Sequence, residues 1–186
     1  MKKEKIKILT VSAIMVALST VLSFLKVYEL PLGGSITVLS MLPVCMIGLL
    51  FGVKAAILPC FLYGAIQMMI GGVFGWGLTP VILIGAIIFD YLLAFGVLCF
   101  SGSFRKKGFW GIIFGIGLAC VLRFASHMVS GCIFFRSFDI FGNPYLYSLV
   151  YNGSYMLPEL ILTIIGAVVL FKTLFKIPFF KNLIKD

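Results

Sequence analysis

Ionisable and polar side chains interrupt three apolar runs of this chain. Asp90 stands near the middle of a run that is long enough to cross a bilayer, and Arg123 and His127, one helical turn apart, interrupt a second run. A polar cluster from Asn152 to Glu159 lies in a third. Ionisable groups at membrane depth usually face a bundle interior or a wet cavity, so the pattern predicts a membrane protein that holds a polar, cationic ligand. Alternatively, Asp90, Arg123 and Glu159 pair with one another and have only a structural role.

The composition supports an integral membrane protein. Hydrophobic residues make up 62% of the chain and charged residues 11%, and the mean hydropathy is +1.19. At about 20 residues per span, 186 residues allow five to seven helices and no extramembrane domain, so we expect one domain over residues 1–186. Residues 8–25 contain no small-residue cleavage motif, which predicts a retained first helix and no signal peptide.

The pattern of apolar runs and breaks predicts an all-α integral membrane bundle of six transmembrane helices. Glycine and proline, in groups such as Gly33 with Gly34 and Gly142 with Pro144, supply the breaks. The predicted spans are residues 6–26, 36–51, 53–71, 79–101, 109–135 and 146–172.

The basic residues predict that both termini are cytoplasmic, because Lys and Arg concentrate in cytoplasmic loops. With the amino terminus inside, only Lys26 and Arg136 fall outside, and Arg123 lies within the membrane. The net charge of +9 is therefore a topology signal, and no nucleic-acid partner is expected. The predicted cytoplasmic set is Lys2, Lys3, Lys5, Lys7, Lys54, Arg105, Lys106, Lys107, Lys172, Lys176, Lys181 and Lys185.

With this topology, the polar side chains gather in the outer half of the bundle. His127, Gly131 and Phe135 are spaced four apart, so they share one face of the fifth helix. Aromatic faces attract a cation and an amide can pair with the edge of a heterocycle, which suits capture of a ligand from outside. Tyr145 and Tyr147 could instead belong to an interfacial aromatic belt. The sixth helix contributes Tyr147, Tyr151, Asn152 and Tyr155.

Metal binding and catalysis have weaker support in the sequence. The cysteines Cys45, Cys60, Cys99, Cys120 and Cys132 all lie in apolar segments without CxxC spacing. A metal site at His127 and Cys132 would lack two ligands, so no metal or cofactor is expected. An intramembrane enzyme could use His127 with Asp90 or with Ser154, but no nucleophile elbow surrounds Ser154.

At these residues the chain resembles the thiamine-specific substrate-binding subunits, or S components, of energy-coupling factor (ECF) vitamin transporters. The most specific stretches are residues 122–131 (LRFASHMVSG) and 143–155 (NPYLYSLVYNGSY). Residues 89–95 (FDYLLAF) resemble the family's acidic-Tyr-Pro-Leu-Ala-Phe segment. Weaker matches are residues 34–37 (GSIT) and the pair Ala13 and Ala17.

The resemblance implies a six-helix bundle in the prokaryotic plasma membrane that binds thiamine from outside. It implies docking through Ala13 and Ala17 onto an ECF membrane coupling subunit, which works with two cytoplasmic ATPase subunits. In this family Asp90 would balance the thiazolium charge, while Asn152 and His127 would hydrogen-bond the aminopyrimidine. The implied substrate-binding residues are Asp90, Tyr91, His127, Gly131, Phe135, Tyr147 and Asn152.

The chain departs from the family pattern at three positions. The family usually has Glu where Asp90 stands, Pro where Leu92 stands and Trp where Phe135 stands. Because Phe is a weaker cation-π partner than Trp, we expect that the affinity or the ligand preference can differ from that of the family. Trp76 could act as a substitute lid aromatic, although we favour its interpretation as an interfacial anchor.

We therefore predict a thiamine-binding S component that is not itself an enzyme. The chain contains no Gly-x-x-x-x-Gly-Lys-Ser/Thr phosphate loop, so the energy of transport must come from ATP hydrolysis in partner subunits. An S component for another heterocycle, such as a pyrimidine precursor or riboflavin, is the alternative within the same class. An intramembrane enzyme using His127 is the alternative from a different class.

Overall fold

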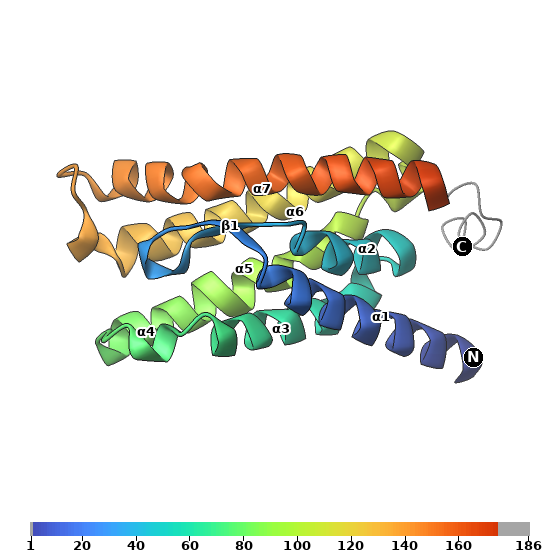
Figure 1. Ribbon diagram of the computed structural model, residues 1–186, viewed down its shortest axis with the longest axis horizontal. Coiled ribbons are helices and arrows are strands. Elements are labelled where there is room, and N and C mark those ends of the chain that lie inside the picture. The colour runs from blue at the N-terminus through green and yellow to red at the C-terminus, as the bar shows by residue number, and fades with distance from the viewer. Residues whose placement is uncertain (1, 175–186) are drawn as a thin grey trace.

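The computed structural model describes residues 2–174 of the chain. Figure 1 shows an elongated bundle in which the helices run roughly along one axis. The start of α1 (Lys2–Ser23) and the end of α7 (Pro144–Leu174) lie at the same end of this bundle. Between them follow α2 (Met41–Phe51), α3 (Val53–Ile70), a composite fourth helix and α6 (Gly108–Ile133).

The fourth helix changes its winding three times along its length. It begins as α4 (Pro80–Ala86), widens into the π-helix η3 (Ile87–Leu93), returns to α-helix in α5 (Ala94–Gly96) and tightens into the 3₁₀-helix η4 (Val97–Gly102). Three short 3₁₀ turns complete the loops between later helices, namely η2 (Val73–Gly75), η5 (Arg105–Lys107) and η6 (Arg136–Phe138). A π-helix within an α-helix often marks a functional site.

A small β-hairpin corrects the purely helical prediction. Strand β1 (Lys26–Glu29) pairs antiparallel with β2 (Ser35–Thr37), and the 3₁₀ turn η1 (Pro31–Gly33) connects them. The first helix therefore ends at Ser23 where the sequence predicted residue 26, and α2 begins at Met41 where the sequence predicted residue 36. Gly33 has a φ of +87°, a left-handed backbone conformation that glycine adopts without a steric cost.

The apolar helices are those of a membrane protein. Four stretches of the described residues are long and apolar enough to cross a membrane: Lys3–Ser23, Val53–Gly75, Pro80–Ile133 and Pro144–Thr173. The third stretch combines the fourth helix with α6. Helix α2 is also apolar but has only 11 residues, too few for a full span.

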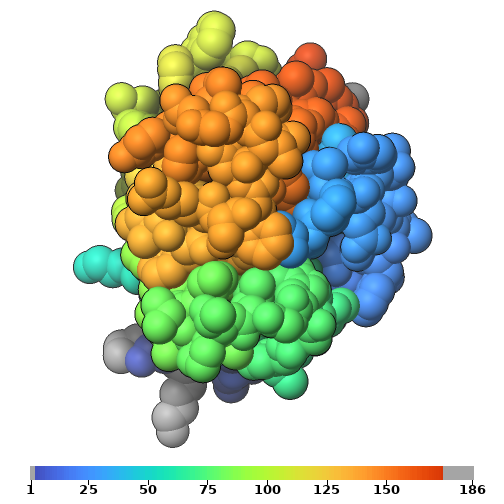
Figure 2. Space-filling model, turned by 90° about the vertical axis from the view of Figure 1, so that its left-hand side faces the viewer, coloured from blue at the N-terminus to red at the C-terminus, as the bar shows by residue number. Residues whose placement is uncertain are grey.

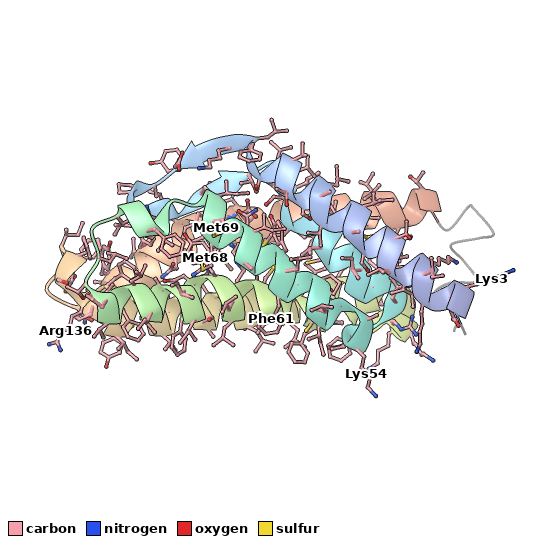
Figure 3. The ribbon with its side chains drawn as sticks, turned by 90° about the horizontal axis from the view of Figure 1, so that it is seen from below. Lys3, Lys54, Phe61, Met68, Met69 and Arg136 are labelled. Carbon is pink, nitrogen blue, oxygen red and sulfur yellow. The ribbon has the colours of Figure 1, made fainter. Side chains whose placement is uncertain are left out.

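Charged side chains mark the two ends of the bundle. In Figure 3, Lys3 and Lys54 lie at one end and Arg136 lies at the opposite end. This separation agrees with the two sides to which the sequence analysis assigned them. Lys176, Lys181 and Lys185 lie outside the described residues, as does the side chain of Lys2.

Helix α2 forms the centre of the core at the end that carries Lys3 and Lys54. Every residue from Met41 to Leu50 is buried, as expected of a helix that is apolar all round. Small residues bring η4 close to it, because a β-carbon on Gly102 would collide with the carbonyl of Gly48. Since α2 begins only at Met41, it leaves room in the other half of the bundle, where the hairpin lies.

Candidate binding site

A cavity of about 270 Å³ lies beyond the amino-terminal end of α2. The fourth helix, α6 and α7 form its walls, and the hairpin and residues 71–76 border it. Figure 2 looks at this end of the molecule, where the hairpin (blue), the loop after α3 (green) and the segment between α6 and α7 (orange) lie side by side. The volume is near the lower limit of small-molecule pockets, which measure roughly 300–1,000 Å³.

All seven side chains or backbone positions predicted to bind the ligand border this cavity. They come from three separate helical segments and from the turn after α6, yet the fold brings them together. Whether they bind a ligand remains a prediction. The seven are Asp90, Tyr91, His127, Gly131, Phe135, Tyr147 and Asn152.

A chain of hydrogen bonds connects the charged residues of the site. Asp90 Oδ1 lies 2.8 Å from His127 Nδ1, and Asp90 Oδ2 accepts a 2.5 Å hydrogen bond from the Ser130 hydroxyl. On the far side of the imidazole, Arg123 Nε donates to His127 Nε2 over 3.4 Å. Because Nε2 accepts this bond, the proton of a neutral His127 sits on Nδ1 and points to Asp90.

The π-helix η3 positions Asp90 and Tyr91. Its wider turn is packed against α3 at Gly64, where a β-carbon would lie 2.8 Å from the Tyr91 carbonyl oxygen. The Tyr91 side chain reaches the end of α3, since a β-carbon on Gly71 would lie 2.6 Å from its hydroxyl. The missing side chains at Gly64 and Gly71 therefore make room for the turn that directs both residues to the cavity.

Aromatic rings form a continuous series along α7 at the cavity wall. The ring centroids of Tyr147 and Tyr151 are 5.8 Å apart at an interplanar angle of 25°, and those of Tyr151 and Tyr155 are 5.9 Å apart. His127 meets Tyr155 edge to face at 6.0 Å. Tyr147 thus borders the cavity, whereas Tyr145 is 71% exposed, as expected of an interfacial aromatic residue.

Asn152 and Gly131 also have structural partners within the protein. The Asn152 amide nitrogen donates to the carbonyl and hydroxyl oxygens of Ser148 at 3.0 and 3.1 Å, and its oxygen accepts from the Tyr155 hydroxyl at 2.8 Å. A β-carbon on Gly131 would collide with Ser148. The Asn152 amide also donates to the His127 carbonyl on α6 over 3.4 Å. Both positions therefore hold α6 and α7 together, in addition to bordering the cavity.

Side chains of α7 also hold the hairpin over the cavity. The Gly34 N–H donates to the Tyr151 hydroxyl over 3.1 Å, and that hydroxyl donates to the Pro31 carbonyl. Deeper in the bundle, the Thr37 hydroxyl donates to Glu159 Oε1 over 2.6 Å, and the Thr37 N–H donates to the same oxygen. The hairpin is thus anchored at its turn and at the end of β2.

Trp76 borders the cavity and contacts the hairpin. A β-carbon on Gly33 would lie 2.8 Å from the Trp76 ring, so the indole packs directly against the turn of the hairpin. The sequence analysis favoured the anchor over the lid, and this contact adds support to the lid interpretation, while both stay predictions. The fold also adds Tyr63, Gln67 and Phe95 to the lining. Their only signal in the sequence was their place on helices that face the bundle interior.

The structural ion-pair alternative is wrong for these charges. Within the described part of the chain, no carboxylate oxygen lies within 4.0 Å of an Arg123 nitrogen. Asp90 is bound by His127 and Ser130, and Glu159 by Thr37. None of the three charges is therefore held in a direct Arg–carboxylate ion pair.

The proposed catalytic pair of Ser154 and His127 is also not formed. Ser154 is exposed, and its hydroxyl donates to the Tyr151 carbonyl over 2.7 Å. His127 is directed to Asp90 and Arg123. Cys132 contacts the Pro144 carbonyl at 3.9 Å, and no group of three potential ligand residues for a metal ion occurs among residues 2–174.

Comparison with known proteins gives one consistent result. A family model described as "Thiamine transporter protein" matches residues 9–178. The thiamine transporter ThiT of Bacillus subtilis (strain 168) is 32% identical over 186 aligned positions, which cover 92% of this chain and 93% of that protein. A solved structure of ThiT from Listeria monocytogenes has a TM-score of 0.78 and 27% identity, with coverage of 91% of this chain and 96% of that chain.

Proposed function

The chain belongs to the thiamine transporter family of S components, which are transporter subunits and not enzymes, and on this premise we propose that its cavity binds thiamine for uptake. The observation that carries the proposal is the convergence of Asp90, His127 and a wall of aromatic rings on one cavity. Thiamine combines a permanent cation with flat rings and ring nitrogens. A carboxylate, aromatic faces and an imidazole match these three features.

Asp90 would balance the thiazolium charge from the wall formed by η3. Phe135, Tyr91 and Tyr147 would contact the flat faces of the ligand, and cation-π attraction contributes about 0.5–2 kcal/mol at each well-placed ring. His127 and Asn152 would hydrogen-bond the aminopyrimidine. Each residue has to exchange a bond within the protein for one to the ligand: Asn152 a bond to Ser148 or Tyr155, and His127 its bond to Asp90 or Arg123.

The protein is a multi-pass membrane protein, and we assign it six membrane segments with both termini in the cytoplasm. The basic side chains at the end marked by Lys3 and Lys54 support this orientation. Helix α2 would cross only the inner part of the bilayer, with the hairpin and cavity beyond it. The cavity would then receive thiamine from outside the cell.

The energy for transport would come from partner subunits, namely an ECF membrane coupling subunit and two cytoplasmic ATPases. Ala13 and Ala17 are both exposed on α1, while Ser12 and Val16 on the same helix are buried in the bundle. Small exposed residues four apart allow another helix to approach closely within the bilayer. This face is therefore our proposed docking site for the coupling subunit.

Isothermal titration of the purified protein with thiamine tests the proposal. We expect saturable binding of one thiamine per chain, with the vitamin recovered unchanged. A panel with riboflavin and pyrimidine precursors should show weaker binding or none. Preference for another heterocycle would overturn the substrate assignment, and consumption of thiamine would contradict a binding subunit.

A further inference from the structure

Arg123 is a buried cation in the wall of the cavity, and the proposed recognition of thiamine gives it no role. Its residue is only 9% exposed, on the face of α6 that borders the cavity. The Phe95 ring covers one face of the guanidinium, whose carbon lies 4.3 Å from the ring centroid. The planar edge of the guanidinium, which carries its N–H groups, is left to make hydrogen bonds.

Only part of that edge is used by the protein. The Nε–H donates to His127, and Nη1 donates to the thioether sulfur of Met41, which is a weak acceptor. Among the described residues, Nη2 makes no hydrogen bond. A guanidinium has five N–H donors, so most of its donor capacity is unused.

The nearby carboxylates do not relieve this shortage. Glu159 is only 4% exposed, and its Oε1 accepts two bonds from Thr37. Asp90 lies on the other side of the His127 ring, bonded to Nδ1. Ser12 Oγ is the only buried side-chain nitrogen or oxygen without a partner among the described residues, so the free N–H groups of Arg123 are open to the cavity. A ligand that fills the cavity has to supply an acceptor to these N–H groups, because a donor that is buried without a partner is costly.

We propose that Arg123 is a specificity-determining residue that donates a hydrogen bond to the alcohol oxygen of thiamine, which rests on the proposed thiamine-binding function. Thiamine carries this hydroxyl on a two-carbon arm attached to the thiazolium ring. Asp90 and Arg123 carry opposite charges on opposite sides of the His127 imidazole. A ligand with a cationic ring and an oxygen acceptor on a short arm fits this polarity in one orientation only.

The geometry of arginine suits this role better than that of lysine. The guanidinium is planar and held in place by His127 and Phe95, so its free N–H groups point in fixed directions. A lysine ammonium would keep the charge but could not make the same contacts to the imidazole and the cavity together. The preference for a ligand with the hydroxyl should therefore decline in the order Arg, Lys, Met at this position.

Titration with two ligands tests the proposal. Thiamine is compared with its deoxy analogue, in which hydrogen replaces the hydroxyl, on the wild type and on Arg123→Met. We expect the wild type to bind thiamine at least about tenfold more tightly than the analogue, and Arg123→Met to bind the two within about threefold. Arg123→Lys should keep an intermediate preference. Arg105→Met is the matched control, because Arg105 donates to the Leu50 carbonyl outside the cavity lining, and it should keep the wild-type preference.

Several outcomes would overturn the assignment. A wild type that binds both ligands equally removes the hydroxyl contact without any variant, so the test does not depend on folding of Arg123→Met. A variant that keeps the full wild-type preference assigns Arg123 to structure alone. A further comparison uses an analogue of thiamine that lacks the pyrimidine amine. If Arg123→Met no longer distinguishes thiamine from this analogue but still prefers thiamine to the deoxy analogue, Arg123 contacts the aminopyrimidine, which also contradicts the proposal. Failure of the wild type to bind thiamine would be a failure of the proposed function itself.

Discussion

Asp90 keeps an uncompensated charge although both of its oxygens accept hydrogen bonds. Ser130 is neutral, and His127 is neutral as well when its Nε2 accepts from Arg123, because an imidazolium has no acceptor nitrogen. The two partners fix the position of the carboxylate without removing its charge. Asp90 is therefore a prepared counter-ion, which requires little rearrangement when a cation binds.

Replacing Asp90 by Asn should weaken thiamine binding at least tenfold, which corresponds to about 1.4 kcal/mol. The amide keeps the shape of the carboxylate and can still accept from His127, so the protein should insert and fold. Isothermal titration measures the loss. Asp139→Asn is the matched control, because Asp139 is half-buried in the loop before α7 and does not border the cavity. Unchanged affinity of Asp90→Asn would exclude the carboxylate from charge recognition, whereas Asp90→Glu should be tolerated.

At the scale of elements, the π-helix η3 and the hairpin shape the cavity from opposite sides. The wide turn of η3 directs Asp90 and Tyr91 inward and packs on the bare backbone of Gly64. The hairpin closes the outer side through contacts with Trp76 and Tyr151. Both are departures from regular transmembrane helix, and irregular backbone at membrane depth is tolerated where it borders a cavity.

Gly64→Ala should displace the π-helix and weaken ligand binding. The new β-carbon would lie 2.8 Å from the Tyr91 carbonyl oxygen and 3.1 Å from the Phe95 β-carbon, so the backbone of η3 has to move. We expect lower thermal stability and an affinity for thiamine reduced at least several-fold. Gly117→Ala on α6 is the control: its β-carbon would meet no atom within 4 Å, and Ala favours a helix over Gly by about 1 kcal/mol. Equal behaviour of the two variants would show that packing at Gly64 does not position the site.

Tyr151→Phe should loosen the hairpin and speed the release of thiamine. The variant loses the hydroxyl that accepts from Gly34 and donates to Pro31, while the stacked ring remains. Each bond is worth about 0.5–1.5 kcal/mol, so the dissociation rate should rise several-fold. Stopped-flow measurement of intrinsic fluorescence can follow this rate. Tyr145→Phe, at an exposed ring of the same helix, should dissociate at the wild-type rate; an unaltered rate in Tyr151→Phe as well would mean that the hairpin does not limit release.

Residue chemistry predicted the lining of the cavity better than it predicted the backbone. Asp90 and His127 could be identified from the sequence because ionisable residues are conspicuous in apolar runs. The hairpin could not, since strands of four and three residues beside apolar helices give too short a pattern to distinguish from helix ends. The π-helix was equally invisible, because its residues are as apolar as those of an α-helical span. The lack of a carboxylate partner for Arg123 depends on side-chain geometry, which no spacing encodes.

At the scale of the whole molecule, the bundle has a packed half and a hollow half. Helix α2 fills the first, and the cavity with its hairpin occupies the second. A substrate-binding subunit needs both, because ligand capture requires a cavity and association with partners requires a firm surface. The exposed pair Ala13 and Ala17 lies on α1, whereas the cavity is formed mainly by the fourth helix, α6 and α7. Binding and docking should therefore be separable by mutation.

Ala13→Trp or Ala17→Trp should abolish thiamine uptake in cells while the isolated protein still binds thiamine with wild-type affinity. The indole would block close approach of a partner helix to α1, but neither alanine borders the cavity. Uptake of labelled thiamine and titration of the purified variants measure the two properties separately. Val121→Trp is the control, because Val121 is 60% exposed on α6 and a bulky apolar side chain there should only meet lipid. Uptake at the wild-type rate in both alanine variants would place the docking surface elsewhere, and a joint loss of binding and uptake would show that the stripe supports the bundle itself.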